Sequence, residues 1–575
     1  MSPPPSGFPP LLLLVLFGSL LSGGLRSPWA WTFAAVPLWT AAIAGGRGFS
    51  RLPGGRLWGA WLAWTALSAL SCAEPLTAAA AYSRLTTGFL VFALACAHLH
   101  GPPARHWFRL LLLSAALLAV SVFLLPASGY PMAGLLFPYK NYAVCVEAAA
   151  FSACLGALQA GHPPSRRSKA GVLLLMAFLL WAILSAGSRA GLLACGAAAA
   201  VVGLRSRRRL WVLVLLLSAV TAFGLAPMKR LSALLKLDAS GSYARPAIWD
   251  AALSVARDSP LLGEGPGLFE RGFLRHNFPA PWSVDHPTRY GMRTPYAHSE
   301  LLQAAAETGI PGAGLLLSAL AAALLAGLRR PPSWPRTAAL SAFCAMSAHA
   351  LVDNVSALPA LGWLHLSALA VFSAGEESPE RPPPPLSRPL RVAGLLLAAL
   401  SWWPRWAVED AFRRSNATQG GPAILWARAA LKVSPADAQL WRTLALAHLK
   451  TAPADADAAL GALAEAERLS PTDAVHPLTA AEVLRARCRW PATLAVAGRV
   501  LLLEPDCQQA RLLRAEALWR LDRRREAREE LDRLERKGAV SRAGARRGYN
   551  AVILSFDEPR YRSLRDEIRS SSGTP

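Results

Sequence analysis

Hydrophobic and polar positions divide the chain at residue 404. Before it, apolar runs of 15 to 30 residues alternate with short polar segments. A helix needs about 20 apolar residues to cross the hydrocarbon core of a bilayer, and slightly fewer where its terminal side chains reach the interface. The runs lie near residues 9–23, 28–44, 57–72, 82–99, 107–125, 141–160, 170–187, 190–204, 210–227, 298–327, 337–352, 356–374 and 389–404. This pattern predicts an all-α, polytopic membrane domain over residues 1–404, with about 12–13 spans.

Beyond residue 404, apolar positions recur at helical spacing in a polar sequence. Three segments align there: VSPADAQLWRTLALAHL, LSPTDAVHPLTAAEVLRA and LEPDCQQARLLRAEALWRL. Their prolines, Pro435, Pro471 and Pro505, are 36 and 34 residues apart, which resembles the roughly 34-residue period of tetratricopeptide repeats. We predict a helical-repeat solenoid over residues 405–575, with three repeats and a basic capping helix at Arg523–Lys537. Such solenoids bind partner proteins; an irregular helical bundle is the alternative.

Composition supports this division of the chain. Hydrophobic residues make up 53% of the chain and charged residues 17%, against about a quarter in soluble domains. Residues 1–404 carry 31 Lys and Arg with 14 Asp and Glu, whereas residues 405–575 carry 29 and 22. The high hydrophobic and low charged content excludes a disordered protein and argues against an ordinary cytosolic enzyme. The net charge of +24 could indicate nucleic acid binding, but no basic helix or aromatic RNA-binding motif accompanies it, so we predict no nucleic acid partner.

The positions of Lys and Arg predict the orientation in the membrane. Alternate short loops hold eighteen of these residues, and the other set holds only four: Arg26, Arg84, Lys140 and Arg189. Because basic loops stay on the cytoplasmic side, we predict a cytoplasmic N-terminus and an external loop over residues 228–297. A thirteenth span would put residues 405–575 outside as well, whereas an error of one span would move them inside.

The external loop contains a helix followed by a glycine-rich segment. Residues 245–257 are amphipathic, with Arg245 at the start of the predicted helix and Trp249 one turn later. A turn and then Gly263, Gly265 and Gly267 follow. Glycine loops that bind phosphate usually follow a strand and open a helix. Since no strand is predicted here, we interpret the glycines as a tight turn that repacks the chain on the membrane.

Three polar residues lie where predicted spans meet the outer side. Arg189 separates two apolar runs, and an arginine there either reaches the interface or serves a function. His298 opens the span that follows the long loop; a neutral imidazole there could act as a general base, although a lone histidine is often structural. Asp353 ends another span, where it could be functional or could orient an arginine.

Four motifs follow one another along the chain: GSRAG (187–191), RPAIWDAALSVARDSPLLGEGPGLF (245–269), HSELLQAAAETGIPG (298–312) and HALVDN (349–354). In this order they resemble the O-antigen ligase/polymerase family of bacterial envelope glycosyltransferases, and FPYKNYAV (137–144) is a weaker match to the same family. The resemblance covers about residues 130–375, with Ser299 departing from an asparagine that is common after the histidine.

The resemblance implies an enzyme of the bacterial inner membrane. Its reaction would be an inverting transfer from an undecaprenyl-pyrophosphate-linked glycan to a lipid A core, a growing glycan or a protein, at the periplasmic face and without metal or cofactor. Arg189 and Arg245 would bind the pyrophosphate, and His298 would deprotonate the acceptor. The supporting residues would be Asp353, Asn141, Trp249 and Glu307.

Other features of the sequence bear on this hypothesis. No cysteine or histidine cluster has the spacing of zinc ligands, and no carboxylate pair at glycosidase spacing indicates hydrolysis. A transporter or flippase for lipid-linked glycans is an alternative, but it would favour internal repeats and charges at the membrane midplane. A membrane-anchored scaffold built around the solenoid is a further alternative, in which Arg189 and His298 would be dispensable.

Overall fold

The computed structural model describes residues 8–45, 52–124, 140–162, 165–204, 244–278, 293–374, 388–451, 454–544 and 557–570. Helices dominate these residues, and no strand occurs in them. The chain is an all-α, polytopic membrane protein, as its hydrophobic pattern predicted. Two compact units make up the chain: Met1–Ser242 with Ala256–Gly267 and Tyr296–Trp403, and Tyr243–Val255 with Leu268–Pro295 and Pro404–Pro575.

The helices of the first unit follow the predicted spans. They are α1 (Phe8–Leu21), α2 (Pro28–Gly45), α3 (Gly55–Ser71), α4 (Pro75–His98), α5 (Pro102–Leu124), α6 (Lys140–Gln159), α7 (Arg166–Ser185), α8 (Arg189–Leu204), α13 (Glu300–Leu328), α14 (Trp334–Ala350), α15 (Pro359–Ser373) and α16 (Arg388–Leu400). The predicted span 210–227 lies outside the described residues. By length and apolar composition alone, four of the described helices could cross a membrane: α4, α6, α7 and α13.

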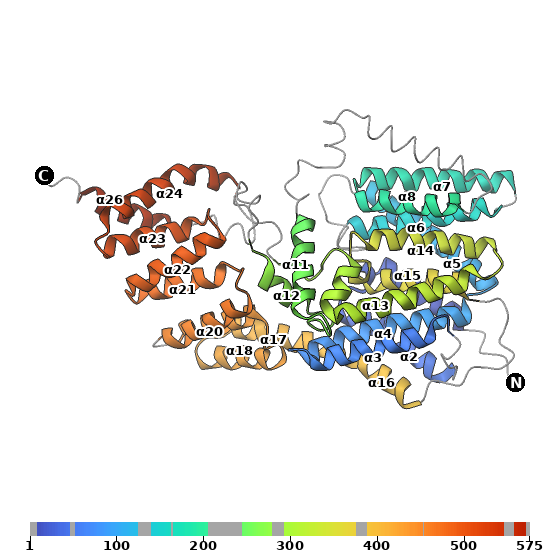
Figure 1. Ribbon diagram of the computed structural model, residues 1–575, viewed down its shortest axis with the longest axis horizontal. Coiled ribbons are helices and arrows are strands. Elements are labelled where there is room, and N and C mark those ends of the chain that lie inside the picture. Colours follow the sequence, from blue (N-terminus) through green and yellow to red (C-terminus); the bar gives the residue numbers. More distant parts are fainter. Residues whose placement is uncertain are drawn as a thin grey trace. The chain divides into compact units, whose positions relative to one another are not determined.

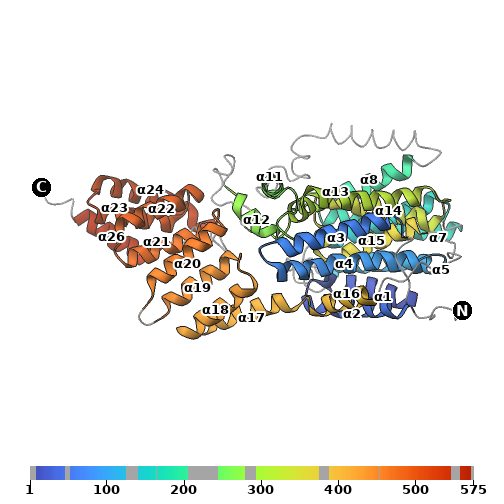
Figure 2. The ribbon, with the colours of Figure 1, turned by 60° about the horizontal axis from the view of Figure 1, so that its bottom comes forward.

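Small side chains bring the helices of this unit together. Helix α14 packs against α6 and α8, and α13 packs against α3. A Cβ atom at Gly156 in α6 would collide with the side chain of Ser341 in α14, so only glycine allows this approach. Such small-residue contacts are typical of helices in membranes. Figures 1 and 2 show the helices side by side, with α7 and α8 at one edge of the bundle and α2 and α16 at the other.

Two arginines from the basic loops donate hydrogen bonds to the ends of neighbouring helices. The Arg336 guanidinium donates hydrogen bonds to the carbonyl oxygens of Phe372 in α15 and Gly327 in α13, at 3.0 and 2.7 Å. Arg391 donates to the carbonyl oxygen of Ile43 in α2 at 2.7 Å. The last carbonyls of a helix have no partner within it and carry its negative pole. Each arginine therefore stabilises the C-terminus of a neighbouring helix.

The second unit is built from consecutive helices. They are α11 (Ala244–Asp258, in this unit through Val255), α12 (Phe269–His276), α17 (Trp403–Ala417), α18 (Gly421–Val433), α19 (Ala438–Leu449), α20 (Ala456–Leu469), α21 (Val475–Ala486), α22 (Trp490–Leu503), α23 (Gln508–Arg520), α24 (Arg524–Gly544) and α26 (Glu558–Ser570). Figure 1 shows those from α17 to α26 following one another in chain order.

Each repeat-marking proline stands just before the first helix of a pair. The pairs are α19 with α20, α21 with α22, and α23 with α24. The segment that we predicted as a capping helix, Arg523–Lys537, lies in α24 except for its first residue, and α24 packs against α23. The last described helix is α26, and its Tyr561, Leu564 and Ile568 complete an apolar cluster with α23 and α24.

Part of the long loop packs within the second unit. In α12, Arg271 forms an ion pair with Asp437 at 3.0 Å, and the carbonyl oxygen of Leu274 accepts a hydrogen bond from the Thr472 hydroxyl at 2.6 Å. Asp437 and Thr472 lie directly before α19 and α21. The loop segment thus contacts the turns that begin two of the helix pairs. Periodicity could not predict this contact, since it joins residues more than 160 positions apart.

Candidate active site

A histidine–aspartate pair lies at the start of α13. The Nδ1 atom of His298 is 2.9 Å from Oδ1 of Asp353. Because a carboxylate only accepts hydrogen bonds, we assign the proton of a neutral imidazole to Nδ1, which leaves the lone pair on Nε2. The Asp353 side chain is 4% exposed and that of His298 is 32% exposed. The carboxylate is therefore shielded, while the imidazole retains access to a reactant.

Asp353 joins three separate segments of the chain. Its Oδ1 atom also accepts a hydrogen bond from the backbone N–H of Asn354 at 3.0 Å, and its Oδ2 atom accepts one from Nδ2 of Asn141 at 3.0 Å. Asn141 begins α6, and Asp353 follows α14. The structure thus brings together His298, Asp353 and Asn141, which the sequence analysis had selected from three distant motifs.

The backbone before His298 is held by a second polar pair. The N–H of Ala297 donates to Oε1 of Gln303 at 2.6 Å, and Nε2 of Gln303 donates to Oε1 of Glu307 at 2.6 Å. His298 itself has a φ of 50°, a left-handed conformation that is uncommon outside glycine and is often found at functional sites. Glu307 therefore supports the site indirectly, by orienting the glutamine that fixes this unusual backbone.

Glu300 links the start of α13 to the loop after Asp353. Its carboxylate accepts hydrogen bonds from the N–H of Ser356 at 2.6 Å and from the Ser356 hydroxyl at 2.8 Å. This contact holds the two segments that carry His298 and Asp353. The sequence analysis did not select Ser356. Glu300 is an acidic residue in the first turn of a helix, and that position does not identify a partner 56 residues away.

The glycine-rich segment supplies a hydrogen bond that α13 lacks at its kink. Pro311 has no N–H group, so the carbonyl of Glu307 loses its partner within the helix. That carbonyl accepts hydrogen bonds from the N–H of Gly265 at 2.9 Å and from the Ser68 hydroxyl at 3.0 Å. In return, the N–H of Ile310 donates to the carbonyl of Pro260 at 2.8 Å. The predicted tight turn is present, with the N–H of Gly263 donating to the carbonyl of Ser259 at 2.9 Å, and it packs on the backbone of α13.

Glycine is required on both sides of this contact. Gly309 has φ 74° and ψ 172°, a region that is essentially restricted to glycine. A Cβ atom there would collide with the carbonyl of Leu261, and one at Gly263 would collide with the backbone of Glu307. The loop and the kinked helix therefore meet through their backbones, which fixes the helix that follows His298.

Arg189 is the first residue of α8. Ser188 precedes it, and the Ser188 hydroxyl accepts a hydrogen bond from the N–H of Gly191 at 3.4 Å, as an N-cap residue does. Gly191 packs so closely on Val144 of α6 that a Cβ atom would collide with it. Val144 lies one turn after Asn141. The exposed Arg189 therefore lies at the same end of the bundle as the His298–Asp353 pair.

Arg245 and Trp249 are in α11, in the part that belongs to the second unit. This helix buries Ile248, Ala252 and Val255, and both predicted site residues are partly exposed. The two residues are thus presented on one amphipathic helix, as its pattern predicted. Their approach to His298 stays a prediction.

The comparisons with known proteins agree with the motifs. No curated protein matches the chain. The family model described as O-Antigen ligase matches residues 174–317, a stretch that contains Arg189, Arg245 and His298 but ends before Asp353. Over this stretch the chain is similar to O-antigen ligases, which supports a function in glycan transfer during envelope glycan biosynthesis.

Proposed function

We propose that the protein transfers a glycan from an undecaprenyl-pyrophosphate donor to an acceptor hydroxyl at the periplasmic face of the bacterial inner membrane. The observation that carries this proposal is the His298–Asp353 pair, with Asn141 on the second carboxylate oxygen. In this pair the carboxylate orients the imidazole, so that its Nε2 atom would accept the proton of the acceptor hydroxyl. A carboxylate that orients a histidine also stabilises the imidazolium formed when that histidine accepts a proton.

The reaction is a single displacement at the anomeric carbon. His298 Nε2 takes the proton from the acceptor hydroxyl, and the acceptor oxygen forms the new bond to the anomeric carbon. The bond from that carbon to the pyrophosphate oxygen breaks with its electron pair, which leaves undecaprenyl pyrophosphate. Attack opposite the leaving group inverts the configuration. General-base assistance of this kind typically contributes about 10²–10⁴-fold to the rate.

Arg189 and Arg245 would bind the pyrophosphate. Guanidinium groups bind phosphate oxygens through paired, charge-assisted hydrogen bonds and stabilise the negative charge that develops on a leaving group. Arg189 also begins α8, where the positive pole of the helix favours an anion. Two fixed arginines would thus serve the role that a divalent cation often has in phosphoryl chemistry.

The contacts of α12 suggest where the C-terminal helices lie. Because Arg271 contacts Asp437 and Leu274 contacts Thr472, the 228–297 loop and residues 404–575 would occupy the same side of the membrane. With the arginine distribution, that side would be the periplasm. The helix pairs would form a tetratricopeptide-like domain that recruits a protein, either as the acceptor or as a partner. The lipid A core and a growing glycan remain alternative acceptors.

Transfer by the purified full-length protein tests this function. The protein would be reconstituted in nanodiscs with a lipid-linked glycan and acceptor candidates, and the rate compared for His298→Ala, Arg189→Ala and Arg245→Ala. Each rate should fall by about 10²-fold or more. The matched controls are exposed residues away from the motifs, His106→Ala and Arg26→Ala, which should retain activity. Wild-type rates in all three site variants, at normal expression, would refute the proposed roles.

A further inference from the structure

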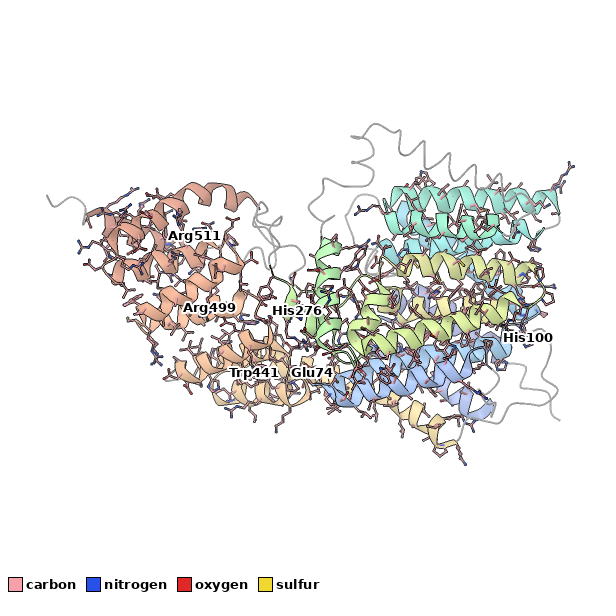
Figure 3. All side chains as sticks on the ribbon, in the orientation of Figure 1. Glu74, His100, His276, Trp441, Arg499 and Arg511 are labelled. Carbon is pink, nitrogen blue, oxygen red and sulfur yellow. The ribbon has the colours of Figure 1, made fainter. Side chains whose placement is uncertain are left out.

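A small cavity lies among the ends of α4, α5, α14 and α15. Its volume is about 110 Å³, and His100, Arg105, Ser333, Trp334 and Arg336 are among the residues that line it. Figure 3 labels His100 at one end of the bundle and Glu74, which precedes α4, at the other. Arg336 binds the carbonyl of Gly327 near the end of α13. Since His298 precedes the start of α13, about 40 Å of helix separates the cavity from the candidate active site.

The lining of this cavity is cationic. Arg105 is exposed and has no hydrogen bond or ion pair with a described residue, while the buried Arg336 guanidinium forms one wall. His100 donates from Nε2 to the carbonyl of Ala97 at 3.2 Å, in the tautomer that this acceptor requires. Residues 98–110 and 327–340 contain no Asp or Glu. Neither segment that carries these cations therefore supplies an acid to balance them; Glu376, Glu377 and Glu380 follow the third lining segment, beyond Ala374 and outside the described residues.

Two further features favour an anion in the cavity. Helices α5 and α14 both begin there, so two positive helix poles face the same space. Ser333 stands before α14, yet its hydroxyl does not cap that helix. The Ser333 Oγ atom is shielded from solvent and has no hydrogen-bond partner among the described residues. A buried hydroxyl normally has a partner, and an oxygen of a bound anion would supply one.

An apolar stripe continues from Arg105 along α5. Arg109, Leu113 and Leu117 follow at intervals of four residues, so all four side chains share one helix face. Leu113 is 55% exposed and Leu117 45% exposed. A phospholipid whose acyl chain lay along these leucines would place its phosphate beside Arg105 and Arg109. A soluble phosphate ion would gain nothing from this stripe.

We propose that the cavity binds a phosphate group, and that its source is an anionic phospholipid in the leaflet opposite His298. Arg105 would contact the phosphate directly, and the Ser333 hydroxyl would donate to one of its oxygens. Arg336 would supply charge from the wall while it holds the C-termini of α13 and α15. The site is independent of glycan transfer, because it lies at the far end of α13 from His298.

Lipid retention by the full-length protein tests this proposal. The wild type and Arg105→Gln would be purified in detergent, incubated with phosphatidylglycerol or phosphatidylcholine, and compared by native mass spectrometry and thermal unfolding. The matched control is Arg166→Gln, an exposed arginine at the start of α7 that does not line the cavity. Loss of one charge-assisted contact should weaken phosphatidylglycerol retention about tenfold in Arg105→Gln, with no such change in Arg166→Gln.

The unfolding midpoint distinguishes the sources of phosphate. A ligand that binds only the folded protein raises this midpoint, so phosphatidylglycerol should raise it in the wild type and much less in Arg105→Gln. If inorganic phosphate protected the wild type as strongly, the phosphate site would stand and the lipid would be refuted as its source. Equal retention of phosphatidylglycerol by all three proteins would overturn the proposal.

Discussion

Polar side chains are used differently in the His298 site and in the helix pairs that follow residue 404. Around His298, a few shielded groups form hydrogen bonds between segments far apart in the sequence, as Asp353 does with His298 and Asn141. In the helix pairs, many Arg–Glu pairs lie on the surface, such as Arg499 with Glu467 at 3.1 Å. The hydrogen bonds around His298 fix the orientation of its imidazole. The exposed ion pairs cover the polar outer faces of helices whose apolar faces pack together.

This difference follows from the surroundings of each group. An exposed ion pair is screened by water and typically contributes about 0–1 kcal/mol. A shielded polar group that loses its partner costs about 1–3 kcal/mol, and more if it is charged. Few polar residues occur among the membrane helices, and each is therefore expected to matter more. Substitutions in the two regions should therefore differ in the size of their effects.

Replacement of Asp353 by Asn should have the largest effect. An amide can donate to Nδ1 of His298, which would place the proton on Nε2 and remove the base. We expect transfer to slow by about 10²–10⁴-fold without a comparable loss of folded protein. Rates measured against pH, with kcat and KM separated, would show the change in kcat. Asp410→Asn, in the exposed pair with Arg414, is the control; equal effects in the two variants would contradict the prediction.

Replacement of Gly309 by Ala should disrupt the contact between α13 and the glycine-rich segment. The added Cβ atom would meet the Leu261 carbonyl at a backbone conformation that alanine avoids. We expect a loss of about 2–4 kcal/mol in stability, measured as a lower unfolding midpoint in detergent. Gly314→Ala in the same helix has open space around it and serves as the control. A similar midpoint for both variants would mean that the kink tolerates repacking.

The ion pair between α12 and the helix pairs should show a moderate coupling. A double-mutant cycle with Arg271→Ala and Asp437→Asn suits it, because asparagine can still cap α19 as Asp437 does through the N–H of Gln439. We expect a coupling free energy of about 0.5–1.5 kcal/mol, with faster hydrogen exchange at residues 269–276 in each single variant. Additive effects would show that the pair does not hold α12 in place.

Replacement of Arg499 by Ala should have the smallest effect. Its guanidinium and the Glu467 carboxylate are 50% and 29% exposed, so we expect a change of less than about 0.5 kcal/mol in the free energy of unfolding. Arg511 provides the contrast in the same unit, since it pairs with the buried Glu530 at 3.3 Å; Figure 3 labels both arginines. If Arg499→Ala destabilised the protein as much as Arg511→Ala, burial would not explain the difference.

Motifs identified several site residues before any contact was known. Histidine, aspartate and asparagine motifs in a characteristic order led to His298, Asp353 and Asn141, which form one hydrogen-bonded group. The role of Glu307 was less predictable, because it acts through Gln303 on the backbone of Ala297. Ser356 gave no signal in the sequence, because its role is to donate a hydrogen bond to Glu300, which lies far from it along the chain.

The sequence alone determined where the helices lie, because apolar run length and helical spacing are local properties of the chain. It also determined which proline precedes each helix pair. Tertiary structure decided which polar groups meet. The repair of the α13 kink by residues 260–265 and the contact of α12 with the turns before α19 and α21 depend on hydrogen bonds between distant segments. Such hydrogen bonds form only after packing has brought their donors and acceptors together, so no local sequence pattern can predict them.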